Sequence, residues 1–152
     1  MRVLIMGGGT PPSRELIFEE YSQSDYVICA DKGGEYLFKL ALTPDLLIGD
    51  FDSIALDALS FLKNSKAIIE TYPKEKDYTD SELCVEKAIS LGATEIIMLG
   101  FTGTRIDHLL GNIGLLEKCL KKGIEAYIVD DNNRIFLAGG PTLLRGSIGA
   151  YL

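Results

Sequence analysis

Two aspartates follow a short apolar run in the stretch LLIGDFDSI. Asp50 and Asp52 are two residues apart, and on extended backbone such side chains point the same way. Paired carboxylates at the edge of a core need water, a proton or a cation between them. Oxygen ligands favour Mg²⁺ over zinc. The pair predicts a magnesium site; alternatively, Asp52 or Ser53 only caps a helix that begins near Ala55.

A second acidic segment, KEKDYTDSE, combines helix capping with polar groups that capping does not need. Thr79 and Glu82 have the spacing of a capping box, and Asp80 in the first turn suits the helix dipole. Lys76 and Asp77 have no part in that capping. Because helix starts also bind phosphate groups, the segment predicts a ligand contact as well as a helix.

The segment GFTGTRIDHLLGNI carries the only histidine of the chain. Thr104 and Asp107 have capping-box spacing after a glycine-containing loop. Arg105, His108 and Asn112 fall at i, i+3 and i+7, which is one face of the predicted helix. A buried structural role would leave several charges without partners, so this group is interpreted as a ligand site.

A fourth segment, ADKGG, places Gly33 and Gly34 after a predicted strand. Their backbone amides could approach an anion at a helix start, although an ordinary strand-to-helix turn explains the pattern too. The chain has no GxxxxGK[ST] motif, and its glycines at 7–9 do not form GxGxxG. Nucleotide phosphates would therefore depend mainly on metal held by aspartates.

Short apolar runs alternate with segments of helical spacing, which predicts βα units around a mainly parallel sheet. The predicted strands are 2–6, 26–30, 45–48, 66–70, 95–99 and 125–129, and the predicted helices are 12–21, 33–40, 55–63, 80–91 and 106–122. Ligands bind beyond the carboxyl ends of such strands, and the four segments above lie there or at helix starts.

The pattern changes after residue 130, where turn residues surround two short apolar runs. Strands at 134–138 and 142–145, joined through 139–141, are predicted to form a hairpin-like connection. We therefore expect a domain at 1–130 and the start of a second, β-rich domain at 131–152.

Composition restricts the class of protein. The 152 residues carry a net charge of −7 and are 47% hydrophobic, which fits a folded domain and disfavours a nucleic-acid partner. Three widely spaced cysteines suggest neither a disulfide framework nor a zinc site, so a reducing cytoplasm is expected. We expect no signal peptide and no membrane span, because no apolar run is long enough.

The four segments together resemble the catalytic domain of thiamin pyrophosphokinases. ADKGG, PDLLIGDFDS, EKDYTDSE and GTRIDHLLGNI match the motifs of that family in order and spacing. The resemblance implies a three-layer α/β/α fold with a mainly parallel sheet, followed by the first strands of a β-sandwich domain. It implies transfer of pyrophosphate from ATP to thiamin, giving thiamin diphosphate and AMP, with Mg²⁺ required and a homodimer for the full-length protein.

The resemblance also implies roles for single residues. Asp50, Asp52 and Asp80 would lie around Mg²⁺ and the triphosphate, Arg105 would neutralise charge on the transferring group, and Asp107 would orient Arg105 or accept the hydroxyl proton. Substrate or ATP binding would fall to Asp31, Gly33, Gly34, Lys76, Asp77, Thr79, Thr102, Gly103, His108 and Asn112. The inserted Lys32 departs from the commoner motif and puts the role of Asp31 in doubt. By this resemblance, the chain contains only the beginning of the β-sandwich domain that contributes to the thiamin site. The chain alone is therefore expected to bind Mg–ATP and to turn over thiamin poorly.

Two alternatives remain at this point. DFDSI resembles the DxDx[TV] segment of haloacid-dehalogenase-type phosphatases, but it ends in Ile54 and follows two earlier βα units. A non-catalytic domain that binds Mg²⁺ or a nucleotide is also compatible with the acidic crevice.

Overall fold

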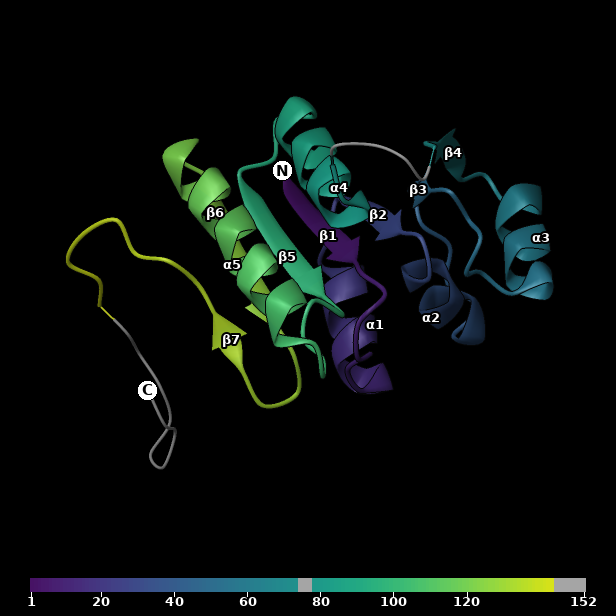
Figure 1. Ribbon diagram of the computed structural model, residues 1–152, viewed down its shortest axis with the longest axis horizontal. Helices are drawn as coiled ribbons and strands as arrows, with labels where there is room; N and C mark the ends of the chain where they lie inside the picture. The colour runs from purple at the N-terminus through teal and green to yellow at the C-terminus, as the bar shows by residue number, and fades with distance from the viewer. Residues whose placement is uncertain (74–77, 144–152) are drawn as a thin grey trace.

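A seven-stranded sheet forms the centre of the computed structural model, which describes residues 1–73 and 78–143 (Figure 1). The strand order is β4-β3-β2-β1-β5-β6-β7. Neighbouring strands are parallel except for β6 and β7, which are antiparallel. The strands are β1 (Arg2–Met6), β2 (Tyr26–Ala30), β3 (Leu46–Gly49), β4 (Ile68–Thr71), β5 (Glu95–Leu99), β6 (Glu125–Val129) and β7 (Arg134–Ile135). The predicted mainly parallel sheet is confirmed.

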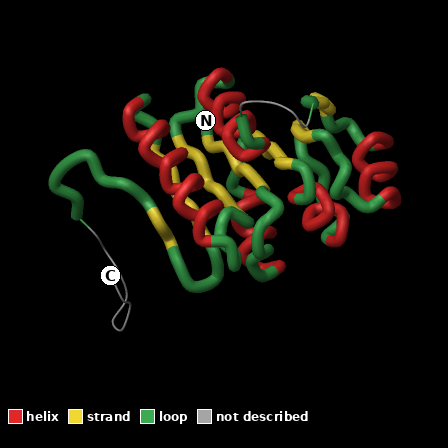
Figure 2. Tube along the Cα trace, viewed as in Figure 1, coloured by secondary structure: helices red, strands yellow, loops and turns green. Residues whose placement is uncertain are grey.

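Five helices cover the two faces of this sheet, as Figure 2 shows for the described residues. They are α1 (Arg14–Ser22), α2 (Gly33–Lys39), α3 (Leu56–Asn64), α4 (Asp80–Ser90) and α5 (Ile106–Lys121). Buried side chains of α4 and α5 pack on one face of the sheet, and those of α1, α2 and α3 pack on the other. The predicted three-layer α/β/α architecture is therefore confirmed.

The inner strands are nearly continuous apolar runs because both of their faces are covered. In β1 the side chains from Val3 to Met6 are fully buried, and those of β5 from Ile96 to Leu99 are as well. At the edge of the sheet β4 is more open, and Ile68 is 58% exposed. The three cysteine thiols are buried in this core, and none of them is in a disulfide.

Local contacts explain where two helices begin. α1 starts at Arg14, two residues later than predicted, because Ser13 is its N-cap and accepts a hydrogen bond from the Leu16 amide at 3.4 Å. The alternative in which Asp52 or Ser53 caps α3 is wrong. The N-cap of α3 is Ala55, which has no capping side chain, and its amide donates to Oε1 of Glu35 at 2.8 Å.

The predicted hairpin near the C-terminus is also corrected. β7 covers only Arg134–Ile135 and pairs with β6, because a turn after Val129 brings the chain back beside that strand. The Arg134 guanidinium lies 4.0 Å from the centre of the Tyr127 ring and helps to hold this edge. Residues 142 and 143 form no strand, and 144–145 lie outside the described residues. The second domain at 131–152 stays a prediction.

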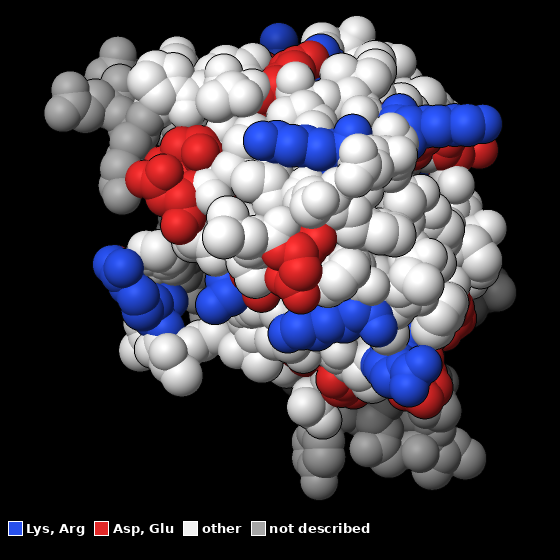
Figure 3. All heavy atoms as spheres, turned by 90° about the vertical axis from the view of Figure 1, so that its right-hand side faces the viewer, with Lys and Arg blue, Asp and Glu red and all other residues white. Residues whose placement is uncertain are grey.

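No helix within residues 1–73 and 78–143 is long and apolar enough to cross a membrane. On the face drawn in Figure 3, basic and acidic side chains of the described residues are interspersed, and no continuous basic patch covers that face.

Candidate active site

A large groove opens at the carboxyl edge of the sheet. Strands β2, β3 and β4 follow one another on one side of β1, and β5, β6 and β7 follow one another on its other side. The arrowheads of β1 and β5 point to this edge of the sheet in Figure 1. Such a switch in strand order is where open α/β sheets bind ligands. The groove has a volume of about 1010 Å³, and its lining includes Gly8, Gly9, Thr10, Asp31, Thr79, Asp80, Thr102, Gly103, Arg105, Asp107, His108 and Asn112.

Nine of the predicted site residues line this groove. They are Asp31, Thr79, Asp80, Thr102, Gly103, Arg105, Asp107, His108 and Asn112. Asp50, Asp52, Gly33 and Gly34 do not line it, whereas Ser53, which follows Asp52 directly, does. Lys76 and Asp77 lie outside the described residues. The fold thus gathers side chains from four separate sequence segments at one edge of the sheet.

The Asp50 loop is a turn, so the extended backbone assumed for the aspartate pair is wrong. Phe51 has a φ of +66°, in the left-handed region, and Oδ1 of Asp50 accepts a hydrogen bond from the Asp52 amide at 3.1 Å. Asp50 is partly buried and Asp52 is exposed. Because the backbone at Phe51 is not extended, the argument that side chains two residues apart point the same way does not apply to this pair.

Asp31 joins this loop to the groove. The Ser53 hydroxyl donates a short hydrogen bond to Oδ2 of Asp31, and the Asp31 amide donates to the Ile48 carbonyl at 2.8 Å. The other carboxylate oxygen, Oδ1, is shielded from solvent and has no hydrogen-bond partner within the described part of the chain. A shielded carboxylate oxygen requires a donor or a cation, so this atom fits a bound positive group.

Gly33 and Gly34 are required for packing. A Cβ on Gly33 would lie 2.1 Å from the Met6 carbonyl oxygen, and one on Gly34 would lie 2.8 Å from Leu62 Cδ1. The Gly34 amide already donates to the Asp31 carbonyl at 3.1 Å. The close approach of α2 to β1 and α3 therefore explains why both positions are glycine, and a bound anion is not needed to explain them.

The start of α4 agrees with its sequence pattern. Thr79 is the N-cap, and its hydroxyl accepts a hydrogen bond from the Glu82 amide at 3.2 Å. Lys118 of α5 also lines the groove, and its Nζ lies 3.0 Å from Glu82 Oε1 and 2.5 Å from Glu86 Oε1. Hydrogen bonds to Glu86 and Glu82 raise the pKa of Lys118, which therefore remains a cation and ties α4 to α5.

Arg105 and Asp107 form an exposed ion pair at the start of α5. Arg105 Nη2 lies 2.5 Å from Asp107 Oδ2, and Nε donates to Oδ1 at 3.2 Å. This hydrogen bonding raises the pKa of Arg105 and lowers that of Asp107. The predicted Thr104 cap is wrong, since the N-cap is Arg105 and no side chain caps the helix. Arg105 therefore precedes the helix, with its guanidinium in a bidentate pair that an anionic ligand could share.

The first turns of α5 carry His108, which is exposed, and Asn112, which is partly buried. The Asn112 side-chain amide donates to the Phe101 carbonyl at 2.7 Å. Asn112 thereby holds the loop at 100–104 against α5, and His108 is left accessible to a ligand in the groove.

Residues 7–10 were not predicted to belong to the site, yet Gly8, Gly9 and Thr10 line it. The Gly9 amide donates to the Gly100 carbonyl and the Thr10 amide to the Thr102 carbonyl, each at 2.8 Å. Tyr36 of α2 also lines the groove and donates its hydroxyl to the Gly9 carbonyl at 2.8 Å. The available sequence signal was a run of glycines directly after the first strand, where close backbone approach is common.

The oxygen donors in and beside the groove indicate how a metal ion could be held there. No group of three or more His, Cys, Asp or Glu side chains is gathered as a ready metal cluster within residues 1–73 and 78–143. Mg²⁺ is usually held by one or two carboxylates together with substrate phosphates and water. The unpartnered oxygen of Asp31 and the nearby aspartate loop fit that mode of binding better than an all-protein cage.

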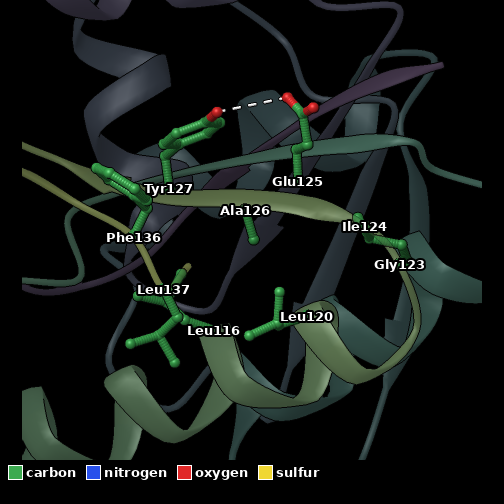
Figure 4. A pocket seen from close by; sticks show the side chains of 9 residues that line it. All are labelled: Leu116, Leu120, Gly123, Ile124, Glu125, Ala126, Tyr127, Phe136 and Leu137. Atoms are coloured by element: carbon green, nitrogen blue, oxygen red, sulfur yellow. Dashed lines mark hydrogen bonds between the residues drawn. The ribbon is translucent and has the colours of Figure 1, made fainter. Parts of the chain in front are cut away.

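A second, smaller cavity lies away from these residues, between α5 and the β6–β7 edge. Its volume is about 220 Å³, and no predicted site residue lines it. Figure 4 shows mainly apolar side chains around it, with one hydrogen bond at 3.4 Å from the Tyr127 hydroxyl to Glu125. It offers few polar groups to a charged substrate.

Comparison with known proteins gives consistent matches. The family described as "Thiamin pyrophosphokinase, catalytic domain" matches residues 18–128. A thiamine pyrophosphokinase of Bacillus subtilis is 36% identical over 108 residues, which are 71% of this chain and 50% of that protein. A thiamine pyrophosphokinase 1 of rice is 29% identical over 131 residues, with 72% of this chain and 49% of that protein covered. The chain thus spans about half the length of these relatives.

Solved structures agree with these matches. A crystal structure of Bacillus subtilis thiamine pyrophosphokinase has a TM-score of 0.76 and 31% identity, and the match covers 90% of this chain and 64% of that one. A Candida albicans thiamin pyrophosphokinase has the same TM-score of 0.76 at 18% identity, covering 89% of this chain and 60% of the other, and so supports the shared fold.

Proposed function

Since the chain belongs to the thiamin pyrophosphokinase catalytic domain family, we propose that it supplies the ATP-binding and catalytic half of a thiamin pyrophosphokinase. The reaction transfers the pyrophosphoryl group of ATP to the hydroxyethyl oxygen of thiamin, releasing AMP and thiamin diphosphate. The main support for this proposal is the groove of about 1010 Å³ at the switch in strand order, which is lined by acidic and basic side chains of the family motifs.

Mg²⁺ is proposed as the metal of this site, with Asp50, Asp52 and Asp80 around it and the triphosphate. The shielded, unpartnered oxygen of Asp31 supports a positive group between these segments. Bound there, Mg²⁺ would neutralise phosphate oxygens. Asp31 and Ser53 would hold the Asp50 loop against the groove through their short hydrogen bond.

The chain's own side chains would position and neutralise the reacting groups. The bidentate geometry of Arg105 and Asp107 keeps the guanidinium in one orientation, and the guanidinium suits the charge on a transferring phosphoryl group. Asp107, whose pKa is lowered by Arg105, would be ionised at neutral pH. It therefore orients Arg105 and can accept a hydroxyl proton only weakly. Thr79, Thr102, His108 and Asn112 line the groove and would contact substrate or ATP directly or through the loops they hold.

One product assay tests this proposal. The full-length protein is incubated with thiamin, ATP and Mg²⁺, and the expected products are AMP and thiamin diphosphate in equal amounts. Release of free phosphate without AMP would instead support the phosphatase alternative. Binding of Mg–ATP without any turnover would support a non-catalytic nucleotide-binding domain, and Asp52→Asn would then change affinity alone.

Two further proposals concern the location of the protein in the cell and its assembly. Three buried cysteines that form no disulfide suit a reducing compartment, which supports a cytoplasmic location. The family resemblance supports a homodimer of the full-length protein. Size-exclusion chromatography with light scattering would measure that assembly state.

A further inference from the structure

The Asp50 loop, residues 50–55, connects β3 to α3 and carries two of the aspartates proposed to surround Mg²⁺. Helix α2 packs against α3, and the two helices lie close together in Figure 1. From the first turn of α2, the side chain of Glu35 reaches the end of this loop, where its Oε1 accepts a hydrogen bond from the Ala55 amide at 2.8 Å. The family motifs do not include Glu35, so the proposed function gives this residue no role.

A second carboxylate beside α2 holds the same loop. Asp31 lies two residues before α2, and its Oδ2 accepts the short hydrogen bond from the Ser53 hydroxyl. Ser53 lines the groove, so this contact lies at the site itself. Between these two contacts, the Ile54 side chain is 6% exposed and packs in the same apolar cluster as Leu37 of α2. The loop is therefore held against the start of α2 by a hydrogen bond on either side of a buried side chain.

The backbone of the loop needs support of this kind. Phe51 has a φ of +66°, in the left-handed region that is unfavourable for a residue with a side chain. Inside the loop, the hydrogen bond from the Ile54 amide to the Phe51 carbonyl is long, at 3.4 Å. A strained turn persists only where the surrounding structure holds it. The contacts with Asp31 and Glu35 supply that restraint from outside the loop.

Capping of α3 is the simpler explanation of the Glu35 contact. In a capping box, a glutamate three residues after the N-cap accepts a hydrogen bond from the N-cap amide. The N-cap of α3 is Ala55, and the residue three positions later is Ala58, whose side chain cannot accept a hydrogen bond. Glu35 supplies that acceptor from a neighbouring helix. If capping were its whole role, the loss of Glu35 would lower stability and leave ligand binding unchanged.

We propose that Glu35 is a positioning residue for the metal–nucleotide site, which acts through the Ala55 amide to hold the Asp50 loop in place beside the groove. This inference rests on the proposed function, because it assigns a supporting residue to the same groove. Side chains that meet a metal and a triphosphate must be held within about 0.5 Å of the productive geometry. Since Ala55 follows the groove-lining Ser53 by only two residues, a shift at Ala55 displaces the loop at the groove.

Titration calorimetry of Mg–ATP binding to the 152-residue chain tests this role. Glu35→Ala removes the acceptor and is expected to weaken binding about 10-fold, because the released loop no longer presents its carboxylates in one geometry. Glu35→Gln keeps an acceptor oxygen at the same reach and is expected to recover most of the affinity. Unchanged affinity in Glu35→Ala would overturn the inference.

A second pair of variants serves if Glu35→Ala does not fold. The side chain in Glu35→Asp is one methylene shorter, so it is expected to lose the contact with the Ala55 amide while keeping the charge. It should bind Mg–ATP more weakly than Glu35→Gln, which keeps the contact without the charge. Equal affinities of these two variants would contradict a role that depends on holding the amide.

Asp45→Ala is the matched control. Oδ2 of Asp45 accepts the Val27 amide at 2.8 Å, which is the same kind of bond from a backbone amide to a distant carboxylate. Asp45 directly precedes β3, so this bond lies at the edge of the sheet opposite the groove. The control is expected to lower the urea midpoint while Mg–ATP affinity changes by less than about 2-fold. An equal loss of affinity in Asp45→Ala and Glu35→Ala would show a general effect of stability and overturn the positioning role.

Hydrogen exchange without nucleotide examines the loop directly. Glu35→Ala is expected to raise amide exchange at 51–55, whereas Asp45→Ala is not. If exchange rises but Mg–ATP affinity does not fall, Glu35 is only a helix cap and the positioning role is overturned. If the unaltered chain binds no Mg–ATP, the proposed function fails, and this inference fails with it.

Discussion

Replacing Gly9 with alanine is expected to push apart the two loops that form one wall of the groove. A Cβ at this position would lie 2.4 Å from the Thr102 carbonyl oxygen and 2.5 Å from that of Gly100. Both are backbone atoms, so neither can rotate away. Ordinary contact begins at 3.4 Å, and the loops must therefore separate by about 1 Å.

The energetic cost follows from that separation. It stretches the hydrogen bonds from Gly9 to Gly100 and from Thr10 to Thr102, both 2.8 Å long. Overpacking costs about 1–3 kcal/mol, and each weakened hydrogen bond adds roughly 0.5–1.5 kcal/mol. A total of about 2–6 kcal/mol lowers the Tm of a domain of this size by on the order of 10 °C.

Gly103→Ala provides the control for Gly9→Ala. Its Cβ would meet Thr10 Oγ1 at 3.5 Å, which is ordinary van der Waals contact, so its Tm is expected within about 3 °C of the unaltered chain. Scanning calorimetry measures both variants, and titration calorimetry measures Mg–ATP binding, which Gly9→Ala is expected to weaken at least 10-fold. A Gly9→Ala protein that melts and binds like Gly103→Ala would refute the close contact between the two loops.

Three further changes have direct expectations. Thr79→Ala removes the α4 cap and should cost about 1 kcal/mol in urea unfolding, while Thr79→Ser should cost little; equal losses would exclude capping as the cause. Gly111→Ala places a methyl group where nothing lies within 4 Å, so it should stabilise α5 by about 0.5–1 kcal/mol; any loss of stability would contradict this helix geometry, and weaker Mg–ATP binding would indicate a ligand against this face. Burial acts to raise the pKa of Asp130, but hydrogen bonds from Asn132, Asn133 and Thr102 outweigh it and lower that pKa. The stability that the ionised Asp130 carboxylate contributes is complete above pH 3.8, its pKa in the unfolded chain, and is lost as the pH falls through its lower pKa in the folded state. Asp130→Asn should therefore flatten the decline of the urea midpoint below about pH 4, and an unchanged slope at acid pH would argue against this contribution.

Much of the fold could be predicted because its strands carry a strong local signal. β1, β2, β5 and β6 match their predicted bounds, since an apolar run buried on both faces has little freedom to begin or end elsewhere. The capping pair of Thr79 and Glu82 likewise acts within four residues and was predicted correctly. β7 was harder, because its partner β6 is selected by the turn at Asp130 and not by the pattern within 134–138.

The sequence motifs predicted nine residues that line the groove, but the local geometry of the site was predictable only where the contacts are close in sequence. Arg105 and Asp107 are neighbours in sequence and form the expected pair in space. The Asp50 loop was misread because Phe51 adopts a left-handed backbone that its residue type does not favour. Gly9 was missed for a different reason. A side chain at this position would collide with the carbonyl oxygens of Gly100 and Thr102, and these lie close only because β1 pairs with β5.

The central place of β1 has a consequence for biosynthesis. This strand is translated well before β5, since Arg2 pairs with Glu95, which is translated 93 residues later. During that interval one edge of an apolar strand lacks its backbone partner, a condition that promotes association between nascent chains. Early protection by chaperones therefore has most value before β5 emerges, and a polypeptide that stops short of β5 is expected in the insoluble fraction.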